Sequence, residues 1–534
     1  MRYKNPVIPG FYPDPSFCRV GDDYYLVTSS FEYFPGVPIF HSRNLVNWTQ
    51  IGHCLTRKTQ LKLHLERSTS GGLLDVYKNL PGFSGGIYAP TLRYHDGTFY
   101  MITTNLNLGK HLCVHTTDPA GEWSEPIWID HGDIGWTIDP SLFFDDDGKV
   151  YLTCKGSGPP AGIYQFEIDI KTGERLTEPQ FIWADTSGKD AEGPHLYRIN
   201  GWYFLMVAEG GTEYGHLESL GRSDNPYGPF EMCPYNPILS HRSLSSPIQA
   251  TGHADIEQDQ NGNWWSVFLG VRPNGYPPAY HLGRETFLAP VNWTDDDWFV
   301  IGEIGKSPAE PNVKLEMEVA ALPQAPDCQQ METIHDDFVL PELNLEWNFY
   351  RNLDAQYWSL DERSGWLTLK GSALTLDEMM NAPVFVGRRQ QHFECVASTM
   401  IEFEPQEDGE EAGLTIFQNN LHHYEIAVVR RDGKRQVIVR RRIGTLSVVV
   451  AEEDIAEGLV TLEIRADRTQ YEFAYGLGIE AVKVIATGET RYLSTEVGGG
   501  FVGVYFAMYA TGNGKASSTP ACFDWFKYAP IYAG

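Results

Sequence analysis

Four acidic residues lie 10 to 12 positions ahead of an aromatic residue that opens a strand-like run. These acids and their aromatic partners are Asp14 with Tyr24, Asp139 with Tyr151, Glu192 with Phe204, and Asp255 with Trp265. If the fold gathers equivalent positions, carboxylates far apart in the chain meet around one cavity, and this crowding raises the pKa of at least one of them. Hydrolysis of a glycosidic bond needs such a pair, because one acid must stay protonated while another is ionised.

The same acids could also serve a structural role or a different chemistry. A single acid beside a proline, as in Pro13-Asp14-Pro15-Ser16, is equally well explained as a turn cap, and only its recurrence weakens that reading. A carboxylate metal cage usually draws on closely spaced ligands, which are not seen here. The sequence has no Gly-x-Ser-x-Gly and no His-Glu-x-x-His, and His111, Cys113 and His115 are better explained as residues of one strand than as zinc ligands.

The elements that must position the acids repeat along the first part of the chain. A turn glycine followed three residues later by a strand-opening aromatic recurs five times, at Tyr24, Tyr100, Tyr151, Phe204 and Trp265. A unit of roughly 50 residues is the size of a four-stranded blade, so we predict a five-bladed β-propeller over residues 1–305. Equivalent turns of a propeller gather at one end of its axial channel. On periodicity alone, a β-sandwich or an irregular barrel remains the alternative.

The remainder of the chain divides into a linker and a second β domain. Residues 306–335 are rich in proline and lack strand alternation, which is typical of a linker along the surface. From residue 336 to residue 534 the chain resumes alternating strands such as Trp366-Leu367-Thr368-Leu369, with no helical stretch. This pattern predicts a β-sandwich. The fold class is therefore all-β.

Several motifs resemble family 43 of the glycoside hydrolases, specifically its two-domain β-xylosidase and α-L-arabinofuranosidase branch. The resemblance runs essentially from end to end. Its motifs are Gly10-Phe11-Tyr12-Pro13-Asp14-Pro15-Ser16, Phe31-Glu32-Tyr33-Phe34-Pro35-Gly36, Gly86-Ile87-Tyr88-Ala89-Pro90-Thr91, Ile138-Asp139-Pro140-Ser141, Glu192-Gly193-Pro194-His195, Thr251-Gly252-His253-Ala254-Asp255 and Gly283-Arg284-Glu285-Thr286. The resemblance implies a five-bladed propeller followed by a concanavalin-like or lectin-like β-sandwich, in agreement with the repeat count.

The resemblance also implies catalytic roles. Asp14 would be the general base, Glu192 the general acid, and Asp139 a third carboxylate that orients the acid and keeps it protonated. The family inverts the anomeric configuration in a single displacement. We therefore predict that the carboxyl groups of Asp14 and Glu192 lie about 6.5–9.5 Å apart, which leaves room for a water molecule.

Substrate and cation contacts are implied for two further residues. Arg284 matches an arginine that reaches substrate hydroxyls, and an ion pair with Glu285 or another acid is the alternative. His253 lies at the propeller axis in relatives, some of which hold calcium or another divalent cation there on a histidine and several waters. A hydrogen-bonded core histidine explains His253 equally well. No cofactor is implied for the chemistry itself.

Aromatic residues are implied to shape the sugar pocket. Phe31 and Tyr88 match lining positions, although many xylosidases carry tryptophan where this chain has Tyr88, which leaves the choice between xylose and arabinose open. The glycine-rich segment Gly498-Gly499-Gly500-Phe501 resembles a loop of the second domain whose phenylalanine closes the pocket. A pocket closed in this way accepts one terminal sugar, so exo action is expected.

We expect an exo-glycosidase that releases terminal β-1,4-linked xylose from xylo-oligosaccharides, with α-L-arabinofuranosidase side activity. A dedicated α-L-arabinofuranosidase acting on arabinoxylan or arabinan fragments is the nearest alternative. A non-catalytic carbohydrate-binding protein is the alternative from a different class, because propellers and sandwiches also bind sugars without cleaving them.

Composition bears on partners and location. With 41 Lys plus Arg against 70 Asp plus Glu, the formal charge of −29 repels nucleic acid and anionic lipid, and neither is expected as a partner. The N-terminal residues lack the apolar stretch of an export signal, and the eight cysteines show no CxxC pair. We therefore expect a cytoplasmic protein with reduced, mostly buried thiols. Whether it forms a homo-oligomer is left open.

Overall fold

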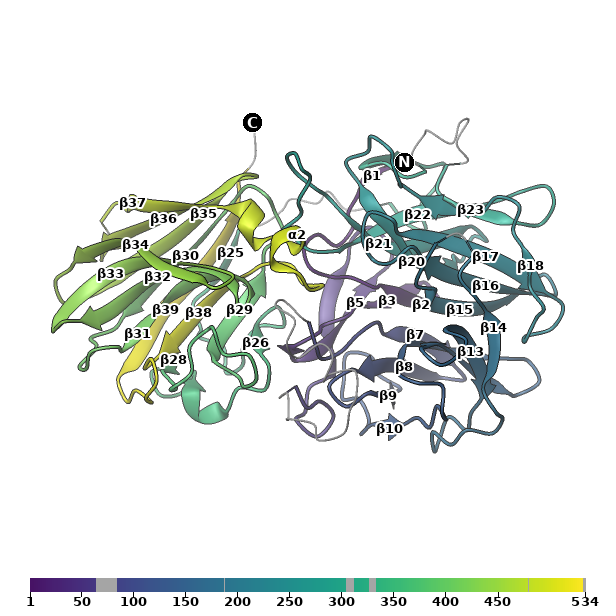
Figure 1. Cartoon of the computed structure of the whole chain (residues 1–534), viewed down its shortest axis with the longest axis horizontal. Coiled ribbons are helices and arrows are strands. Elements are labelled where there is room, and N and C mark those ends of the chain that lie inside the picture. Colours follow the sequence, from purple (N-terminus) through teal and green to yellow (C-terminus); the bar gives the residue numbers. More distant parts are fainter. Residues whose placement is uncertain (64–83, 187, 304–311, 326–332, 479, 532–534) are drawn as a thin grey trace.

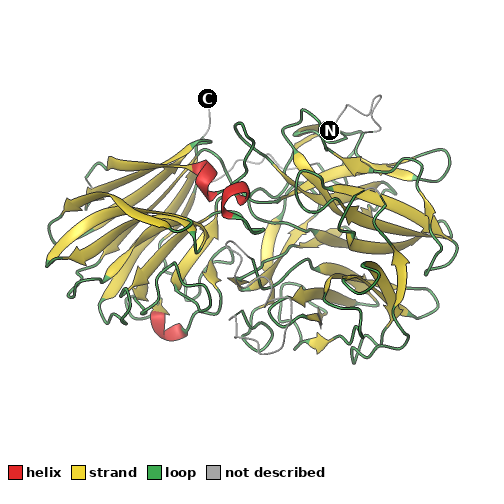
Figure 2. Ribbon diagram, in the orientation of Figure 1, coloured by secondary structure: helices red, strands yellow, loops and turns green. Residues whose placement is uncertain are grey.

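The computed structural model describes residues 1–534 except 64–83, 187, 304–311, 326–332, 479 and 532–534. Its two β-rich parts lie side by side, with the N-terminal part on the right of Figure 1 and the C-terminal part on the left. Strands make up nearly all of the regular structure in Figure 2. The described helices are short: η1 (Ala355–Tyr357), η2 (Thr490–Leu493) and α2 (Thr495–Gly498).

The N-terminal part is a five-bladed propeller, as predicted. Each blade is an antiparallel sheet whose strands follow one another in the chain. The first blade holds β2 (Ser16–Val20), β3 (Asp23–Val27), β5 (Gly36–Ser42) and β6 (Thr49–Leu55). The second holds β7 (Thr91–His95), β8 (Thr98–Asn105), β9 (Lys110–Thr116) and β10 (Ile127–Trp128), and the third holds β11 (Thr137–Phe144), β12 (Val150–Gly156), β13 (Gly162–Glu167) and β14 (Gln180–Trp183).

The last two blades continue the pattern. The fourth holds β15 (Glu192–Ile199), β16 (Trp202–Glu209), β17 (Leu217–Ser223) and β18 (Glu231–Met232), with β19 (Leu239–Ser240) also paired to β17. The fifth holds β20 (Gln249–Gln258), β21 (Trp264–Val271), β22 (Glu285–Trp293) and β23 (Phe299–Ile301). The first strands of the blades contact one another in a closed ring, β2 with β7, β7 with β11, β11 with β15, β15 with β20, and β20 with β2.

The N-terminal segment closes this ring against the last blade. Ile8 forms an antiparallel bridge with Thr286 of β22, and the Asn5 side chain donates to the Leu288 carbonyl while accepting from its N–H. Strand β1 (Arg2–Lys4) pairs with β24 (Glu316–Glu318). Among the described strands, no blade combines strands from the two ends of the propeller, so this edge packing fastens the first blade to the fifth.

The C-terminal part is a β-sandwich, also as predicted. One sheet contains β25 (Ile334–Asp336), β27 (Trp358–Ser359), β28 (Leu367–Lys370), β30 (Cys395–Glu402), β35 (Val460–Ala466), β36 (Gln470–Leu477), β37 (Lys483–Glu489) and β39 (Pro520–Pro530). The other contains β26 (Asn348–Tyr350), β29 (Val384–Arg389), β31 (Glu411–Asn419), β32 (His422–Arg431), β33 (Lys434–Ile443), β34 (Leu446–Asp454) and β38 (Tyr505–Thr511). Apolar residues on alternate strand positions fill the space between the sheets, among them Leu414, Val437 and Leu462.

One strand links the two parts. Strand β4 (Tyr33–Phe34) lies between β3 and β5 of the first blade in the chain, yet it pairs with β26 and extends the second sandwich sheet. The predicted domain limits were 1–305, 306–335 and 336–534. Residues 304–311 and 326–332 of the predicted linker region lie outside the described residues, while β24 within it is a short strand.

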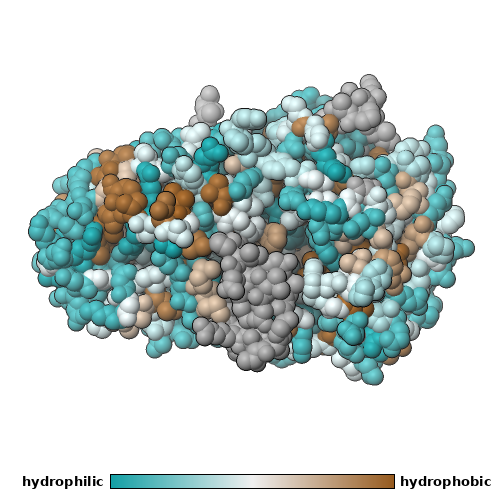
Figure 3. Space-filling model, in the orientation of Figure 1, coloured by the Kyte–Doolittle hydropathy of each residue, from teal (hydrophilic) through white to brown (hydrophobic). Residues whose placement is uncertain are grey.

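The surface is mostly hydrophilic in the view of Figure 3, with apolar side chains gathered over the sandwich. Leu446 and Val448 of β34 and Val484 of β37 are among the exposed apolar residues there. The described cysteines are buried and none forms a disulfide. Among the described residues, none of the helices has the length and apolar character needed to cross a bilayer.

Candidate active site

The candidate catalytic residues lie where the innermost strands of three blades begin. Asp14 lies two residues before β2, Asp139 lies in β11, and Glu192 opens β15. The strand pairing slips by a residue at Asp139 and again just after Glu192, which marks a bulge in each strand. Asp14 and Asp139 have left-handed backbone, with φ of 55° and 54°. Bulges and left-handed residues change where a side chain points, and here they interrupt the strand alternation at the acids.

Asp14 is held by two donors. Nη1 of Arg284 donates to Oδ1 of Asp14 at 2.7 Å, and the Ser29 hydroxyl donates to Oδ2 at 2.5 Å. Both members of the ion pair are buried, with 5% of each side chain exposed. Arg284 also donates to the Thr212 hydroxyl at 3.0 Å. These contacts fix the orientation of the carboxyl group.

For Arg284 the structure shows the ion pair with another acid that was its alternative. Arg284 does form an ion pair, but with Asp14 and not with its neighbour Glu285. Glu285 is wholly buried and is instead bound by Arg272, whose Nε and Nη2 donate at 2.7 and 2.8 Å. Arg284 lies in a bend just before Glu285 opens β22, and the two neighbouring side chains have different partners. Arg284 therefore belongs to the site, and Nε of its guanidinium has no partner in the described structure.

Glu192 has a cationic neighbour that sequence reasoning missed. Nζ of Lys155 donates to Oε2 of Glu192 at 3.0 Å, and it lies 3.5 Å from Oδ1 of Asp190. The Lys155 side chain is only 10% exposed. The sequence carried one signal: a lysine interrupts the buried run of strand β12, between Cys154 and Gly156.

Asp139 has an unusual proton affinity. The pKa of its carboxyl is raised from 3.8 to about 7, mainly by burial. The charges of Glu192 and Asp14 act in the same direction, while His253 and Lys155 act in the opposite direction. Oδ2 of Asp139 accepts from the Gly193 N–H at 3.1 Å, next to Glu192 in the chain. The crowding expected from the repeat therefore falls on Asp139.

His253 lies between these groups. Its Nδ1 is 3.9 Å from Oδ1 of Asp14, and its ring packs so closely on Gly193 that a Cβ there would lie 3.0 Å from ring atoms. In the described part of the chain, no three His, Cys, Asp or Glu side chains are grouped to hold a metal ion. The residues present therefore do not build a protein cage for calcium, and a cation held by His253 and water alone stays a prediction.

Aromatic rings from both domains meet beside the carboxylates. The Phe31 ring lies 5.0 Å from that of Tyr88 and 6.0 Å from that of Phe501. The guanidinium carbon of Arg284 is 5.6 Å from the Phe31 ring and 5.7 Å from the Phe501 ring. The Ser84 hydroxyl accepts from the Phe501 N–H, and the Ser84 carbonyl accepts from the Tyr88 hydroxyl. The predicted lining residues are thus brought together with Asp14.

The loop that carries Phe501 is fastened to the propeller. It follows helix α2, and Gly499 and Gly500 adopt left-handed backbone with φ of 71° and 75°, which favours glycine. In α2 the Glu496 carboxylate accepts from the Tyr214 hydroxyl and from the Tyr280 N–H, both of the propeller. These contacts hold the sandwich loop over the end of the propeller where the acids lie.

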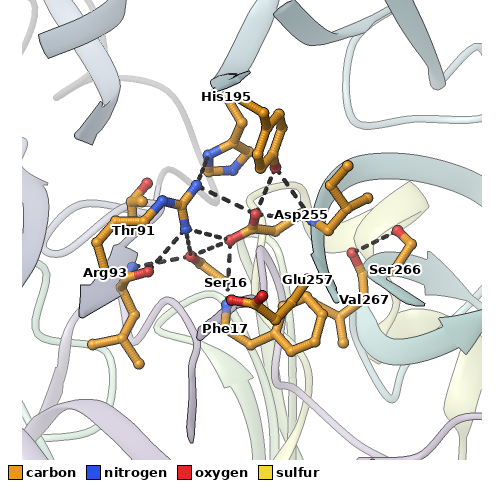
Figure 4. Close-up of polar contacts among 12 residues, drawn as sticks. Ser16, Phe17, Thr91, Arg93, His195, Asp255, Glu257, Ser266 and Val267 are labelled. Carbon is orange, nitrogen blue, oxygen red and sulfur yellow. Dashed lines mark hydrogen bonds and ion pairs between the residues drawn. The ribbon is translucent and has the colours of Figure 1, made fainter. Parts of the chain in front are cut away.

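The fourth repeated acid, Asp255, serves a different purpose. Figure 4 shows the guanidinium of Arg93 between Asp255 and His195, with Ser16 close by. Arg93 donates to Oδ2 of Asp255 at 2.7 Å, and the hydroxyls of Ser16 and Tyr197 donate to its two oxygens at 2.6 Å. Although burial alone would raise the pKa of Asp255, the charge of Arg93 lowers it well below its usual value. Asp255 therefore connects the innermost strands of different blades through an ion pair and hydrogen bonds.

Matches to known proteins decide the family. A model described as glycosyl hydrolases family 43 matches residues 3–299, and one described as the beta xylosidase C-terminal concanavalin A-like domain matches residues 335–529. The chain belongs to glycosyl hydrolase family 43. The predicted glycosidase is therefore confirmed in preference to a non-catalytic carbohydrate-binding protein, and so is the predicted order of propeller and concanavalin-like sandwich.

Individual relatives cover nearly the whole of this family 43 chain. It is 42% identical to the non-reducing end alpha-L-arabinofuranosidase BoGH43B of Bacteroides ovatus, over 98% of this chain and 94% of that protein. It is 38% identical to a xylosidase/arabinosidase of Butyrivibrio fibrisolvens, over 98% of each. The solved structure of a xylan beta-1,4-xylosidase from Bacillus halodurans is similar with a TM-score of 0.88 at 33% identity, covering 99% of this chain and 100% of that one.

Proposed function

We propose that this family 43 enzyme is an exo-acting, inverting glycosidase that releases terminal β-1,4-linked xylose from xylo-oligosaccharides, with α-L-arabinofuranosidase side activity. The observation that carries the proposal is that Asp14 and Glu192 lie at the same end of the propeller and have different hydrogen-bond partners. Asp14 is bound by Arg284 and Ser29, whereas Glu192 opens the first strand of the fourth blade and lies next to Gly193, whose N–H donates to Asp139. Relatives named as xylosidases and as arabinofuranosidases support the substrate class.

In the proposed reaction, each carboxyl group moves one proton. Asp14 accepts a proton from a water molecule as the water oxygen attacks the anomeric carbon. Glu192 gives its proton to the glycosidic oxygen as the bond from that oxygen to the anomeric carbon breaks. The leaving sugar departs as an alcohol, and Glu192 remains as a carboxylate. Because attack and departure occur on opposite faces, the anomeric configuration inverts.

The aromatic residues support exo action. Phe31 and Tyr88 of the propeller and Phe501 of the sandwich come together around the guanidinium of Arg284. Apolar faces of a sugar ring pack on such rings, while Arg284 offers donors to its hydroxyls. We infer that these side chains enclose one terminal sugar and exclude an internal segment of a longer chain.

A dedicated α-L-arabinofuranosidase is the second candidate. The relative at 42% identity is named a non-reducing end alpha-L-arabinofuranosidase, and Tyr88 is the lining position that left the choice of sugar open in the sequence analysis. Rates on 4-nitrophenyl β-xylopyranoside, 4-nitrophenyl α-L-arabinofuranoside and xylobiose separate the candidates. Xylobiose cleavage with the xyloside preferred supports the first candidate. Arabinofuranoside cleavage without any action on xylobiose supports the second.

The catalytic assignment is tested by removing each acid. Asp14→Ala and Glu192→Ala should each lower kcat by about 10²–10⁴-fold, because each removes one proton-transfer partner. Asp224→Ala, a change at an exposed position of the fourth blade, is the control and should leave kcat unchanged. Product anomers followed by NMR should show inversion. Near-normal activity of either variant, with the fold intact by circular dichroism, would reject the assignment.

A further inference from the structure

Lys155 is a buried lysine at the candidate active site for which no role follows from the proposed two-carboxyl reaction. It lies near the end of β12 in the third blade, and 10% of its side chain is exposed. Lysine is rarely so buried unless its charge is matched by a partner. Its ammonium lies 5.6 Å from the centre of the Trp136 ring, which shields one side of it.

Two carboxylates face the ammonium directly. Nζ of Lys155 donates to Oε2 of Glu192 at 3.0 Å and lies 3.5 Å from Oδ1 of Asp190. Asp190 also has an exposed cation beside it, since Lys189 lies 3.7 Å from its other oxygen. Asp190 therefore also interacts with Lys189 and with solvent, whereas Glu192 is contacted by Lys155.

Other charged or titratable groups face Glu192 from the surrounding elements. Asp139 of β11 and His216, just before β17, both interact electrostatically with Glu192. Burial lowers the pKa of His216 to about 4, so this ring is uncharged near neutral pH. Asp139, whose pKa burial raises to about 7, is either neutral or negative. Of these neighbours, Lys155 is therefore the one that stabilises a negative charge on Glu192.

We propose that Lys155 is a positioning residue that strengthens Glu192 as an acid and stabilises the carboxylate left after proton transfer. This inference rests on the proposed role of Glu192 as the general acid. When the proton passes from Glu192 to the glycosidic oxygen, the carboxyl group gains a full negative charge 3.0 Å from Nζ of Lys155. The attraction grows along the reaction, so it lowers the barrier to proton donation. Lys155 itself neither gains nor loses a proton.

The effect of removing the Lys155 charge should depend on how strongly the leaving group requires protonation by Glu192. A 4-nitrophenolate departs readily without protonation, whereas a phenolate or the alkoxide of a second sugar requires it. Lys155→Met removes the charge but keeps an unbranched side chain of similar length. We expect it to lower kcat/KM for the phenyl glycoside and for the natural disaccharide about three- to tenfold more than for the 4-nitrophenyl glycoside.

The pH profile gives an independent measure. Without the ammonium, Glu192 should keep its proton to higher pH, so the alkaline limb of kcat/KM should move upward by about one pH unit in Lys155→Met. Lys155→Arg keeps the charge, so both the alkaline limb of kcat/KM and the dependence on leaving group should be close to those of the wild type. Lys149→Met is the matched control, because Lys149 is a partly exposed cation at the opposite end of β12 that pairs with Glu167.

The outcomes separate this inference from the proposed function. Equal losses on all leaving groups, with an unmoved alkaline limb and a normal melting temperature, would overturn the role of Lys155 while leaving Glu192 as the acid. If Lys155→Met does not fold, the same two readouts on Lys155→Gln decide the question. Full activity of Glu192→Ala would instead remove the proposed function itself.

Discussion

At the scale of single residues, two fully buried aspartates of the propeller differ in protonation because their neighbours differ. Burial raises the pKa of Asp139 to about 7, and the carboxylates of Glu192 and Asp14 act in the same direction. Burial also disfavours the charge of Asp255, but the guanidinium of Arg93 at 2.7 Å outweighs it and lowers the pKa. One acid is therefore available to hold a proton at the site, while the other is a permanent anion in the scaffold.

The raised pKa of Asp139 predicts a pH-dependent stability. Between the usual pKa of 3.8 and the folded value of about 7, the folded state binds a proton that the unfolded chain has released. The free energy of unfolding of the wild type should therefore fall relative to Asp139→Asn as pH rises through this interval, and the difference should stay constant above it. We expect a change of about 1–4 kcal/mol, measured by urea denaturation at several pH values.

An exposed aspartate provides the control for this prediction. Asp146→Asn, at a side chain 91% exposed, should shift stability by a small amount that does not vary over the same pH range. A difference between wild type and Asp139→Asn that is flat with pH would contradict the proton on Asp139.

At the scale of elements, the innermost strands of the first and fifth blades each combine two kinds of residue: one that faces the candidate site and one that holds the blades together. Asp14 is followed two residues later by Ser16, and His253 is followed two residues later by Asp255. The first residue of each pair faces the site, and the second joins the network around Arg93. Because this network connects strands of the first, second, fourth and fifth blades, it fixes the distances between the strands that carry the acids.

Breaking this network should cost stability. Asp255→Asn leaves the Arg93 guanidinium without its anionic partner in a buried site, and we expect a loss of about 3–5 kcal/mol in the free energy of unfolding. The control is Asp23→Asn, which breaks a more exposed pair with Arg43 and should cost less than about 1 kcal/mol. Chemical denaturation measures both. A loss for Asp255→Asn no larger than for the control would show that the network contributes little.

At the scale of the whole molecule, the two domains form one site. Strand β4 of the propeller part extends a sandwich sheet through β26, and the buried Glu32 carboxylate accepts from the Arg351 guanidinium at 2.8 Å. Phe501 then reaches the propeller rings from the opposite domain. The sandwich therefore contributes an aromatic ring beside the candidate active site, and we predict that this ring forms a wall of the proposed sugar pocket.

Removing that wall should reduce activity without unfolding the protein. We expect Phe501→Ala to lower kcat/KM about 10–100-fold, since the ring is partly exposed at the pocket and its loss admits water beside Arg284. The melting temperature should change little. Val497→Ala, at an exposed position of the same segment, is the control and should retain wild-type kinetics. Unchanged kinetics for Phe501→Ala would mean that the sandwich does not shape the pocket.

The sequence alone determined the fold class, the blade count and the candidate acids. These depend on local patterns: a turn glycine before each aromatic, alternation along strands, and an acid at one place in several repeats. The motifs around Asp14, Glu192 and Arg284 carried the family, which the family models then matched. Such signals are readable because each lies within a short stretch of chain.

Only the tertiary structure shows which charged groups surround each acid. Asp139 and Asp255 lie 12 and 10 residues ahead of their strand-opening aromatics, yet only contacts across blades distinguish an acid with a raised pKa from a paired one. The partner of Arg284 and the approach of Lys155 to Glu192 likewise join residues from different strands. Proton affinity depends on burial and on charges within a few ångströms, and those neighbours are set by the packing of the blades and by no pattern along the chain.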